Sequence, residues 1–417
     1  MFWEDYAKSF EGRVQRYLHR QSRKLYLRIH GIEPRGKGSM PAGDRLSVQR
    51  NLLSQMRSRR RCAYRGPLVL KLRVQTTDKA PSHAHTIAKN LLDLFGKPLP
   101  SVSTSRRGIV YFDDRQVHAL SVSCEHGSAE PAIHVEIQSL SDFRQDLALA
   151  RHASSTMGLL ESRELRTGFH LWRTRSLPGA VENAGGDQAA FELLHRMDRQ
   201  ELQRSILQAA KITPTELAYL YRAYETGYPG HERQLDEFAL RWEKLFELRN
   251  FRMTLTELPQ RRGTSEEYRR EIDENLYRLS TEFRQLLVPL YIPLALEIVI
   301  KPPPPSRTQA LHDLDNVLRT YLIPRVVETF APPSDVAWVF HSQVQEDVST
   351  YFGQRLNRLP KSARLGLIRF EAWRIPRAQS DQSPGFVGVS VVADDSGYND
   401  TISSVYNVID TWRDKDW

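Results

Sequence analysis

The predicted order of strands and helices occurs twice along this chain, and this repetition limits the fold more than any other feature. Each copy reads strand, helix, strand, helix, strand, strand, judged from two-residue alternation and helical spacing of apolar residues. The first copy is predicted at 24–30, 45–61, 67–75, 84–95, 108–124 and 131–138, and the second at 251–258, 265–287, 293–300, 313–330, 364–376 and 385–393. We therefore expect an α/β (α+β) fold made of two similar units, each with a mixed sheet and helices.

The residues between the two copies are predicted to be helical. Helical periodicity runs through 187–210, 214–226 and 231–248, and Thr213-Pro214-Thr215-Glu216 has proline at the first helical position. A chain of 417 residues is also too long for one typical core. We expect a basic unit at 1–140, a helical linker domain at 141–248 and a second unit at 249–417.

Basic residues are concentrated in the first third of the chain. Residues 1–140 hold 24 Lys and Arg against 12 Asp and Glu, whereas the whole chain has a net charge of +9. The densest run includes Arg57, Arg59, Arg60 and Arg61. Such a concentration favours a polyanionic partner, because each phosphate contact releases counterions. Nucleic acid is the expected partner, and a solvated basic face of a helix is the plainer alternative.

The composition argues against several other classes of protein. No apolar run is long enough to cross a bilayer, and Glu4 and Asp5 stand where a signal peptide is basic. We therefore expect a cytoplasmic protein without a membrane partner. Two cysteines, Cys62 and Cys124, are too few for a disulfide framework or a cysteine-based metal cluster. A phosphate-binding Gly-Lys-Ser/Thr loop is also missing from the sequence.

The most distinctive local pattern is Asp313-Leu314-Asp315-Asn316, which follows a predicted strand and begins a predicted helix. Two carboxylates at this spacing can converge on one cation, and Mg2+ or Mn2+ is often held by one or two carboxylates together with water and substrate phosphate. Arg319 lies within reach of the same phosphate, and Asp335 is a candidate third carboxylate. The residues alone leave a plainer alternative, in which Asp313 is a helix N-cap and Asp315 a solvated first-turn residue.

This pattern resembles the signature of the RusA family of Holliday-junction resolvases. In that family Asp-x-Asp-Asn-x-x-Lys follows a strand, and Asp313-x-Asp315-Asn316-x-x-Arg319 matches it except at the last position. The first copy supplies the other half of the signature, because Asp113-Asp114-Arg115-Gln116-Val117 resembles the family's Asp-Asp-x-Gln-Val segment. The resemblance covers roughly 24–140 and 250–393.

Neither copy carries the full signature. In the first copy, His83 and His85 stand where the family has aspartates, although Lys89 stands at the position of the family's lysine. One alternative is a modified metal site, in which these histidines act with Asp113 and Asp114. The other alternative is a degenerate site that now binds or supports nucleic acid. The second copy has arginine for lysine and lacks the Asp-Asp-x-Gln-Val segment.

The resemblance implies a dimeric, magnesium-dependent endonuclease that acts on branched DNA in recombination or repair. Two fused units would reproduce that dimer in one chain. The metal ligands would then be Asp313, Asp315 and Asp335, with Arg319 and Lys89 on phosphate and Arg57, Arg59, Arg60 and Arg61 on the DNA backbone. The alternative function is a catalytically degenerate nucleic-acid-binding subunit of a larger complex. The helical middle is a candidate surface for a protein partner or a homodimer.

Overall fold

The fold is taken from a computed structural model of the chain. The structure describes residues 3–78, 84–125, 127–157, 202–221, 251–256, 265–283, 294–303, 367–375, 384–393 and 400–415, with the further positions 199, 246, 292, 322, 323, 325 and 326.

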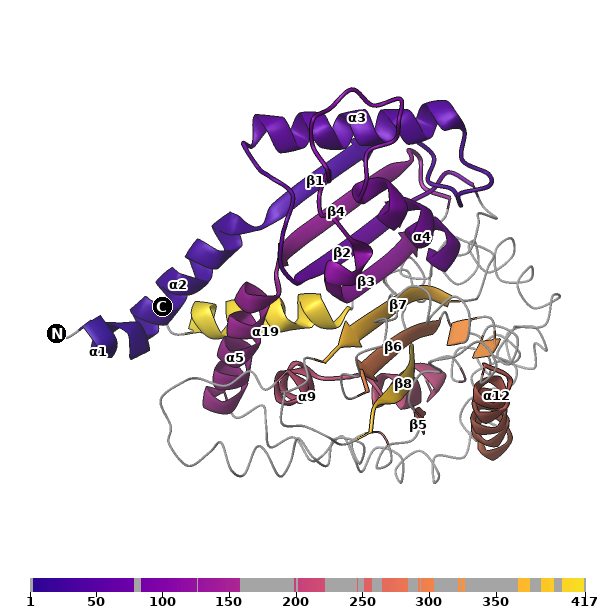
Figure 1. Cartoon of the computed structure of the whole chain (residues 1–417). Coiled ribbons are helices and arrows are strands. Elements are labelled where there is room, and N and C mark those ends of the chain that lie inside the picture. The colour runs from indigo at the N-terminus through magenta and orange to yellow at the C-terminus, as the bar shows by residue number, and fades with distance from the viewer. Residues whose placement is uncertain are drawn as a thin grey trace, which may run out of the picture.

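The described strands form one mixed sheet of eight strands in the order β1-β4-β2-β3-β7-β6-β8-β5 (Figure 1). Their bounds are Leu25–His30 (β1), Leu68–Gln75 (β2), Val117–Glu125 (β3), Ala132–Ser139 (β4), Arg252–Leu255 (β5), Leu294–Lys301 (β6), Leu367–Arg374 (β7) and Phe386–Ala393 (β8). The sheet and its flanking helices confirm the predicted α/β fold class.

The two halves of the sheet repeat one connectivity. In the first half β1 pairs antiparallel with β4, β4 antiparallel with β2, and β2 parallel with β3. In the second half β5, β8, β6 and β7 pair in the same way. Both parallel pairs even carry a register shift at the same place, at Leu68/Val69 and at Leu294/Ala295. Because β3 and β7 join the halves as antiparallel neighbours, an approximate twofold axis relates one half to the other.

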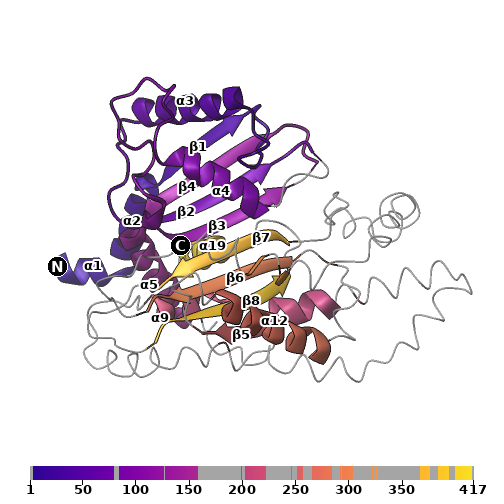
Figure 2. The ribbon, with the colours of Figure 1, turned by 45° about the vertical axis from the view of Figure 1, so that its right-hand side comes forward.

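Helices cover both faces of the sheet (Figures 1 and 2). One face shares a core with α3 (Ala42–Ser58), α4 (Ala84–Phe95) and α12 (Ser265–Glu282). The opposite face shares a second core with α2 (Phe10–Arg23), α5 (Leu140–Thr156), α9 (Pro214–Leu220) and α19 (Thr401–Lys415). The helices follow the twofold as well: α3 and α12 come after the first strand of each half, and α5 and α19 after the last. Among the described helices, none combines the length and apolar character needed to cross a membrane.

Several predicted elements differ from the structure in their bounds. The N-terminal segment forms two helices, α1 (Trp3–Lys8) and α2, because the Ser9 hydroxyl caps α2 by accepting from the Gly12 N–H at 3.2 Å. The strand expected from 108 begins only at Val117, after a short 3-10 turn, η1 (Asp114–Gln116). Helix α5 lies in the region predicted to be helical but in none of the helices named there, and α19 was not predicted. The helix start at Thr213-Pro214 is confirmed, with a reciprocal capping box between Thr213 and Glu216.

Candidate nucleic-acid interface

The structure places the predicted site residues of the first half only. The described segments contain Lys89, His85, Asp113, Asp114 and the four arginines at 57 and 59–61. The candidate metal ligands and phosphate contact of the second half lie outside the described residues, as does one histidine of the first half: Asp313, Asp315, Arg319, Asp335 and His83.

The four arginines lie at and beyond the end of α3, in a segment named here the arginine turn (Arg57–Arg61). The sequence predicted a helix to residue 61, but α3 ends at Ser58. The Arg60 N–H donates to the Arg57 carbonyl at 2.9 Å, and the Arg61 N–H donates to the Met56 carbonyl at 2.8 Å. This pattern terminates a helix through a residue in the left-handed region, usually glycine. Here that residue is Arg60, with a φ of 53°, so the turn carries backbone strain.

Two side chains of the arginine turn bind neutral groups, and the other two extend into the solvent. Arg59 donates to the Tyr26 carbonyl, and Arg61 donates to the Arg23 carbonyl at 3.3 Å. Arg57 and Arg60 are exposed, and within the described part of the chain their guanidinium groups have no hydrogen-bond or ion-pair partner. A carbonyl holds a guanidinium in place without cancelling its charge. The turn therefore presents a cluster of positive charge to the solvent.

The counterpart helix in the second half has the opposite charge balance. In α3 the single acidic residue is Asp44, whereas α12 carries six acidic residues against three arginines. The approximate twofold thus relates helices of similar position but different charge. Only the first-half helix is suited to a polyanion.

Gln49 and Gln55 fix α3 against its neighbours. The buried Gln49 amide donates to the carbonyls of Leu94 at 2.9 Å and Lys97 at 3.0 Å and accepts from the Leu99 N–H at 2.8 Å, which joins α3 to the end of α4. Neither glutamine was predictable from the sequence, because a polar residue on an amphipathic helix normally indicates the solvent side.

The first-half residues that resemble the family signature are brought together at α4. Lys89 Nζ lies 3.5 Å from Asp114 Oδ2 and 3.4 Å from Asp93 Oδ1. Lys37 Nζ lies 3.1 Å from the other Asp93 oxygen, Oδ2. His85 precedes Lys89 by one helical turn and so lies on the same side of α4. Lys89 and the Asp-Asp segment, two separate parts of the first copy, therefore lie side by side.

Gln116 and Asp113 build the turn that carries Asp114. The Gln116 amide accepts from the N–H groups of Phe112 at 2.8 Å and Asp113 at 3.0 Å and donates to the Tyr64 carbonyl at 2.9 Å. The Arg115 N–H donates to the Asp113 carboxylate at 2.9 Å, and this bond lowers the pKa of Asp113. Asp113 and Gln116 are three residues apart, and this spacing allows both side chains to cap the same turn.

The described residues of this first-half site do not fit a divalent cation. Among them, no group of three His, Cys, Asp or Glu side chains is close enough to hold a metal ion. The carboxylates of Asp93 and Asp114 face the ammonium groups of Lys37 and Lys89 instead. A bound cation would be repelled by those ammonium groups. The modified metal site also requires His83, which lies outside the described residues, so both alternatives for this copy stay open.

A row of polar residues crosses the sheet on its α5–α19 face, and sequence analysis missed it. Strand register aligns one residue from each strand, namely Tyr26, Glu136, Lys71, Ser121, Glu371, Glu297, Ser390 and Arg252. The twofold relates Lys71 to Glu297 and Ser121 to Glu371. Any one of these residues, taken within its own strand, resembles a solvent-facing position.

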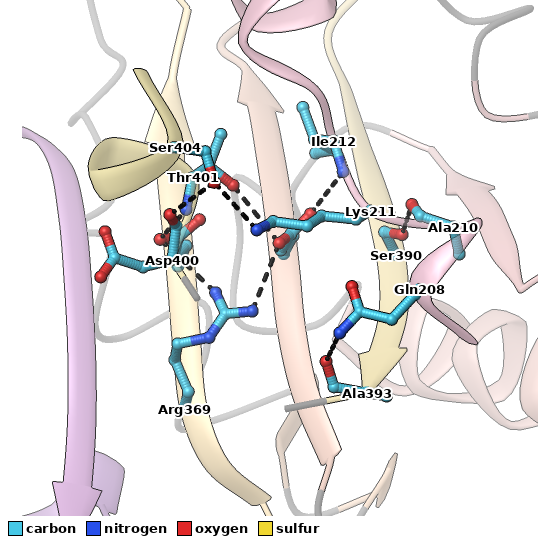
Figure 3. A network of polar contacts seen from close by, with 12 residues as sticks. Gln208, Ala210, Lys211, Ile212, Arg369, Ser390, Ala393, Asp400, Thr401 and Ser404 are labelled. Atoms are coloured by element: carbon cyan, nitrogen blue, oxygen red, sulfur yellow. Dashed lines mark hydrogen bonds and ion pairs between the residues drawn. The ribbon is translucent and has the colours of Figure 1, made fainter. Parts of the chain in front are cut away.

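The centre of the row is a buried charge network (Figure 3). Arg369 lies 3.4 Å from carboxylate oxygens of both Glu297 and Glu371, and all three side chains are fully buried. The Thr401 N–H at the start of α19 donates to Glu371 at 2.8 Å. Burial raises the pKa of Glu371 to about 7. The network holds α19 on the sheet, and its lack of solvent exposure assigns it to stability rather than to substrate.

Comparison of the chain with protein-family models, curated proteins and solved structures found no match.

Proposed function

We propose that this protein binds nucleic acid through the first half of its sheet, with the arginine turn on the phosphate backbone. The observation that carries the proposal is the turn itself, where a strained helix end holds four guanidinium groups against carbonyls or solvent. Binding a phosphate chain there releases counterions, which is a large favourable contribution. Contacts of this kind position a backbone without reading its sequence.

The difference in charge between the two halves supports the same proposal. The acidic α12 occupies the place of α3 in the second half, and like charges would repel a phosphate chain from it. Lys89 and Lys37 extend the positive surface of the first half toward α4, although Asp93 and Asp114 partly balance them. We therefore expect a nucleic acid to lie against one half of the sheet rather than across the twofold.

A binding measurement tests this proposal. Arg57→Gln/Arg60→Gln should weaken the binding of a labelled duplex about tenfold or more, because two phosphate contacts are lost. The matched control is Arg269→Gln/Arg270→Gln on α12, two exposed arginines in the counterpart helix, which should leave duplex affinity unchanged. Equal losses in both variants would show that only net charge matters and would refute a role for the arginine turn.

A second candidate function is metal-dependent cleavage of branched DNA by the second half. It is favoured because β6 and β7 repeat the parallel pairing and register shift of β2 and β3, so the Asp313-x-Asp315 segment follows the strand equivalent to β2. A bound Mg2+ or Mn2+ would supply a nucleophilic water and neutralise charge on the phosphate. Asp313, Asp315 and Asp335 are the proposed ligands, and Arg319 is the proposed phosphate contact.

Cleavage of an end-labelled four-way junction with Mg2+ or Mn2+ distinguishes the two functions. Wild-type cutting that is lost in Asp313→Asn/Asp315→Asn, with junction affinity retained, supports the second candidate. Binding by both proteins without metal-dependent cutting by either leaves nucleic-acid binding as the function.

A further inference from the structure

The outer face of β1 carries three exposed side chains that no described helix covers. Leu25, Leu27 and Ile29 point into the core beneath α3 and are buried. Tyr26, Arg28 and His30 alternate with them and point to the opposite face. The Tyr26 side chain is 43% exposed, and Arg28 and His30 are also exposed. An aromatic ring, a guanidinium and an imidazole therefore follow one another at a spacing of about 7 Å along one strand.

The neighbouring strands continue this surface. Arg28 lies directly opposite His134 of β4, and His134 lies directly opposite Arg73 of β2. The rings of His30 and His134 pack edge to face with centroids 5.7 Å apart. We name these five residues of β1, β4 and β2 the open sheet face: Tyr26, Arg28, His30, His134 and Arg73.

The open sheet face has an excess of positive charge. Arg73 forms an ion pair with Glu125 at 3.1 Å. Glu136, which lies opposite Tyr26 on β4, forms an ion pair with Lys24 at 2.8 Å. Within the described residues, the Arg28 side chain has no ion-pair partner. Arg28 and Arg73 flank His134 on either side, and burial together with the neighbouring guanidinium groups lowers the pKa of that imidazole. An anion placed over the two arginines would balance their charge.

The backbone edge of β1 is closed to another peptide strand. The Gln55 amide accepts from the Arg28 N–H at 3.1 Å and donates to the Arg28 carbonyl at 2.6 Å, as a neighbouring strand would. Arg59 covers the Tyr26 carbonyl in the same way. A partner of this region must therefore bind side chains rather than extend the sheet.

We propose that the open sheet face binds an unpaired strand of nucleic acid, with bases against the rings of Tyr26 and the histidines and phosphates against Arg28 and Arg73. This inference rests on the proposed function and specifies its substrate. Aromatic side chains that alternate with basic side chains bind single-stranded nucleic acid, because each unpaired base exposes a face for stacking. In a duplex that face is covered by the neighbouring base pairs. Arg59 joins the arginine turn to Tyr26, so one branched molecule can place its duplex on the turn and its unpaired strand on the sheet.

Fluorescence anisotropy with a labelled oligothymidine and a labelled hairpin duplex, both in EDTA, tests this inference. Tyr26→Ser/Arg28→Gln should lower oligothymidine affinity about tenfold or more and leave hairpin affinity unchanged, since one stacking and one phosphate contact are lost. Tyr26→Phe, which keeps the ring, should retain oligothymidine affinity. Tyr277→Ser/Arg278→Gln, the same exchange at two exposed residues of α12, is the matched control and should change neither affinity.

Oligothymidine binding that survives in Tyr26→Ser/Arg28→Gln would overturn this inference while leaving the proposed function in place. Failure of the wild type to bind either probe would overturn both. Photo-crosslinking of the wild-type protein to a 5-iodouracil oligonucleotide provides a second test, which does not depend on whether a substituted protein folds. The crosslinks should map to the tryptic peptides 25–28, 29–35 and 116–144, which carry Tyr26, His30 and His134, and crosslinks confined to other peptides would contradict the assignment.

Discussion

Lys71 of β2 and Asp400, the residue before α19, form an ion pair with 2.7 Å between Nζ and Oδ2. The pair joins a strand of the first half to the last helix of the second half. Asp400 also caps α19 by accepting from the Ser403 N–H at 2.7 Å, and its side chain is only 2% exposed. The two halves are thus tied by a buried charge pair as well as by the β3–β7 pairing.

Asp400→Asn should lower the free energy of unfolding by about 3 kcal/mol, because it leaves the Lys71 ammonium without its buried partner. Urea unfolding followed by circular dichroism measures this change. Adding Lys71→Met should recover part of the loss, since the unpaired charge is removed. The control is Arg413→Gln, whose partners Asp414 and Asp410 are 68% and 43% exposed, and its effect should stay below about 0.5 kcal/mol. Equal losses in Asp400→Asn and Arg413→Gln would contradict a buried coupling between the halves.

Glu371 should make stability fall as the pH rises from about 5 to about 7. Its folded pKa, raised by burial to about 7, exceeds the ordinary value of 4.5. The folded state therefore holds a proton that the unfolded state has lost, and this contribution disappears above pH 7. A shift of this size corresponds to at most about 3 kcal/mol.

Urea unfolding of wild type and Glu371→Gln across this pH range isolates the contribution of Glu371. Burial lowers the pKa of His118 to about 4, which acts in the opposite direction and is common to both proteins. The difference between the two proteins should therefore grow in favour of the variant as the pH rises. Parallel stability curves would show that Glu371 does not titrate in this range.

Arg60→Gly should stabilise the fold by about 1 kcal/mol and weaken duplex binding. Glycine adopts the left-handed conformation of Arg60 without strain, while a phosphate contact of the arginine turn is lost. Thermal unfolding and duplex titration measure the two effects. Arg57→Gly, inside the last turn of α3, should instead destabilise the fold by about 1 kcal/mol. Destabilisation by both substitutions would rule out strain at Arg60.

The repeated strand and helix order was predictable because each strand has a strong apolar pattern. Residues 293–300 are apolar except for Glu297 and residues 385–393 except for Ser390, and the structure has β6 and β8 there. Helix α5 was missed because its buried face includes Asp146, which Arg20 of α2 neutralises at 2.6 Å. Local periodicity cannot reveal a polar residue that is buried against a distant partner.

The resemblance singled out Asp113, Asp114 and Lys89 but not their geometry. The sequence predicted a strand over 108–124, whereas the turn at Asp113–Gln116 and its approach to Lys89 depend on hydrogen bonds and an ion pair that the structure shows. The end of α3 was placed too late, because arginine is a good helix former and nothing in the sequence indicates a left-handed Arg60. The open sheet face was also missed, since it requires the register of β1, β4 and β2.

Metal dependence offers a further prediction for the second half. If Asp313 and Asp315 hold a divalent ion, isothermal titration with Mn2+ should show binding to the wild type and none to Asp313→Asn/Asp315→Asn. Substituting Asp113 and Asp114 by asparagine should leave Mn2+ binding unchanged, because the first-half carboxylate of Asp114 faces Lys89. Loss of Mn2+ binding only in the first-half variant would move the proposed metal site to the other copy.

The salt dependence of duplex binding tests the central claim most directly. The slope of log Kd against log salt concentration reports the number of phosphates neutralised. Arg57→Gln/Arg60→Gln should reduce the magnitude of this slope by about 2, roughly one for each phosphate contact removed. Arg269→Gln/Arg270→Gln on α12 should leave it unchanged. An unaltered slope in the arginine-turn variant would contradict the proposal that this turn binds the nucleic-acid backbone.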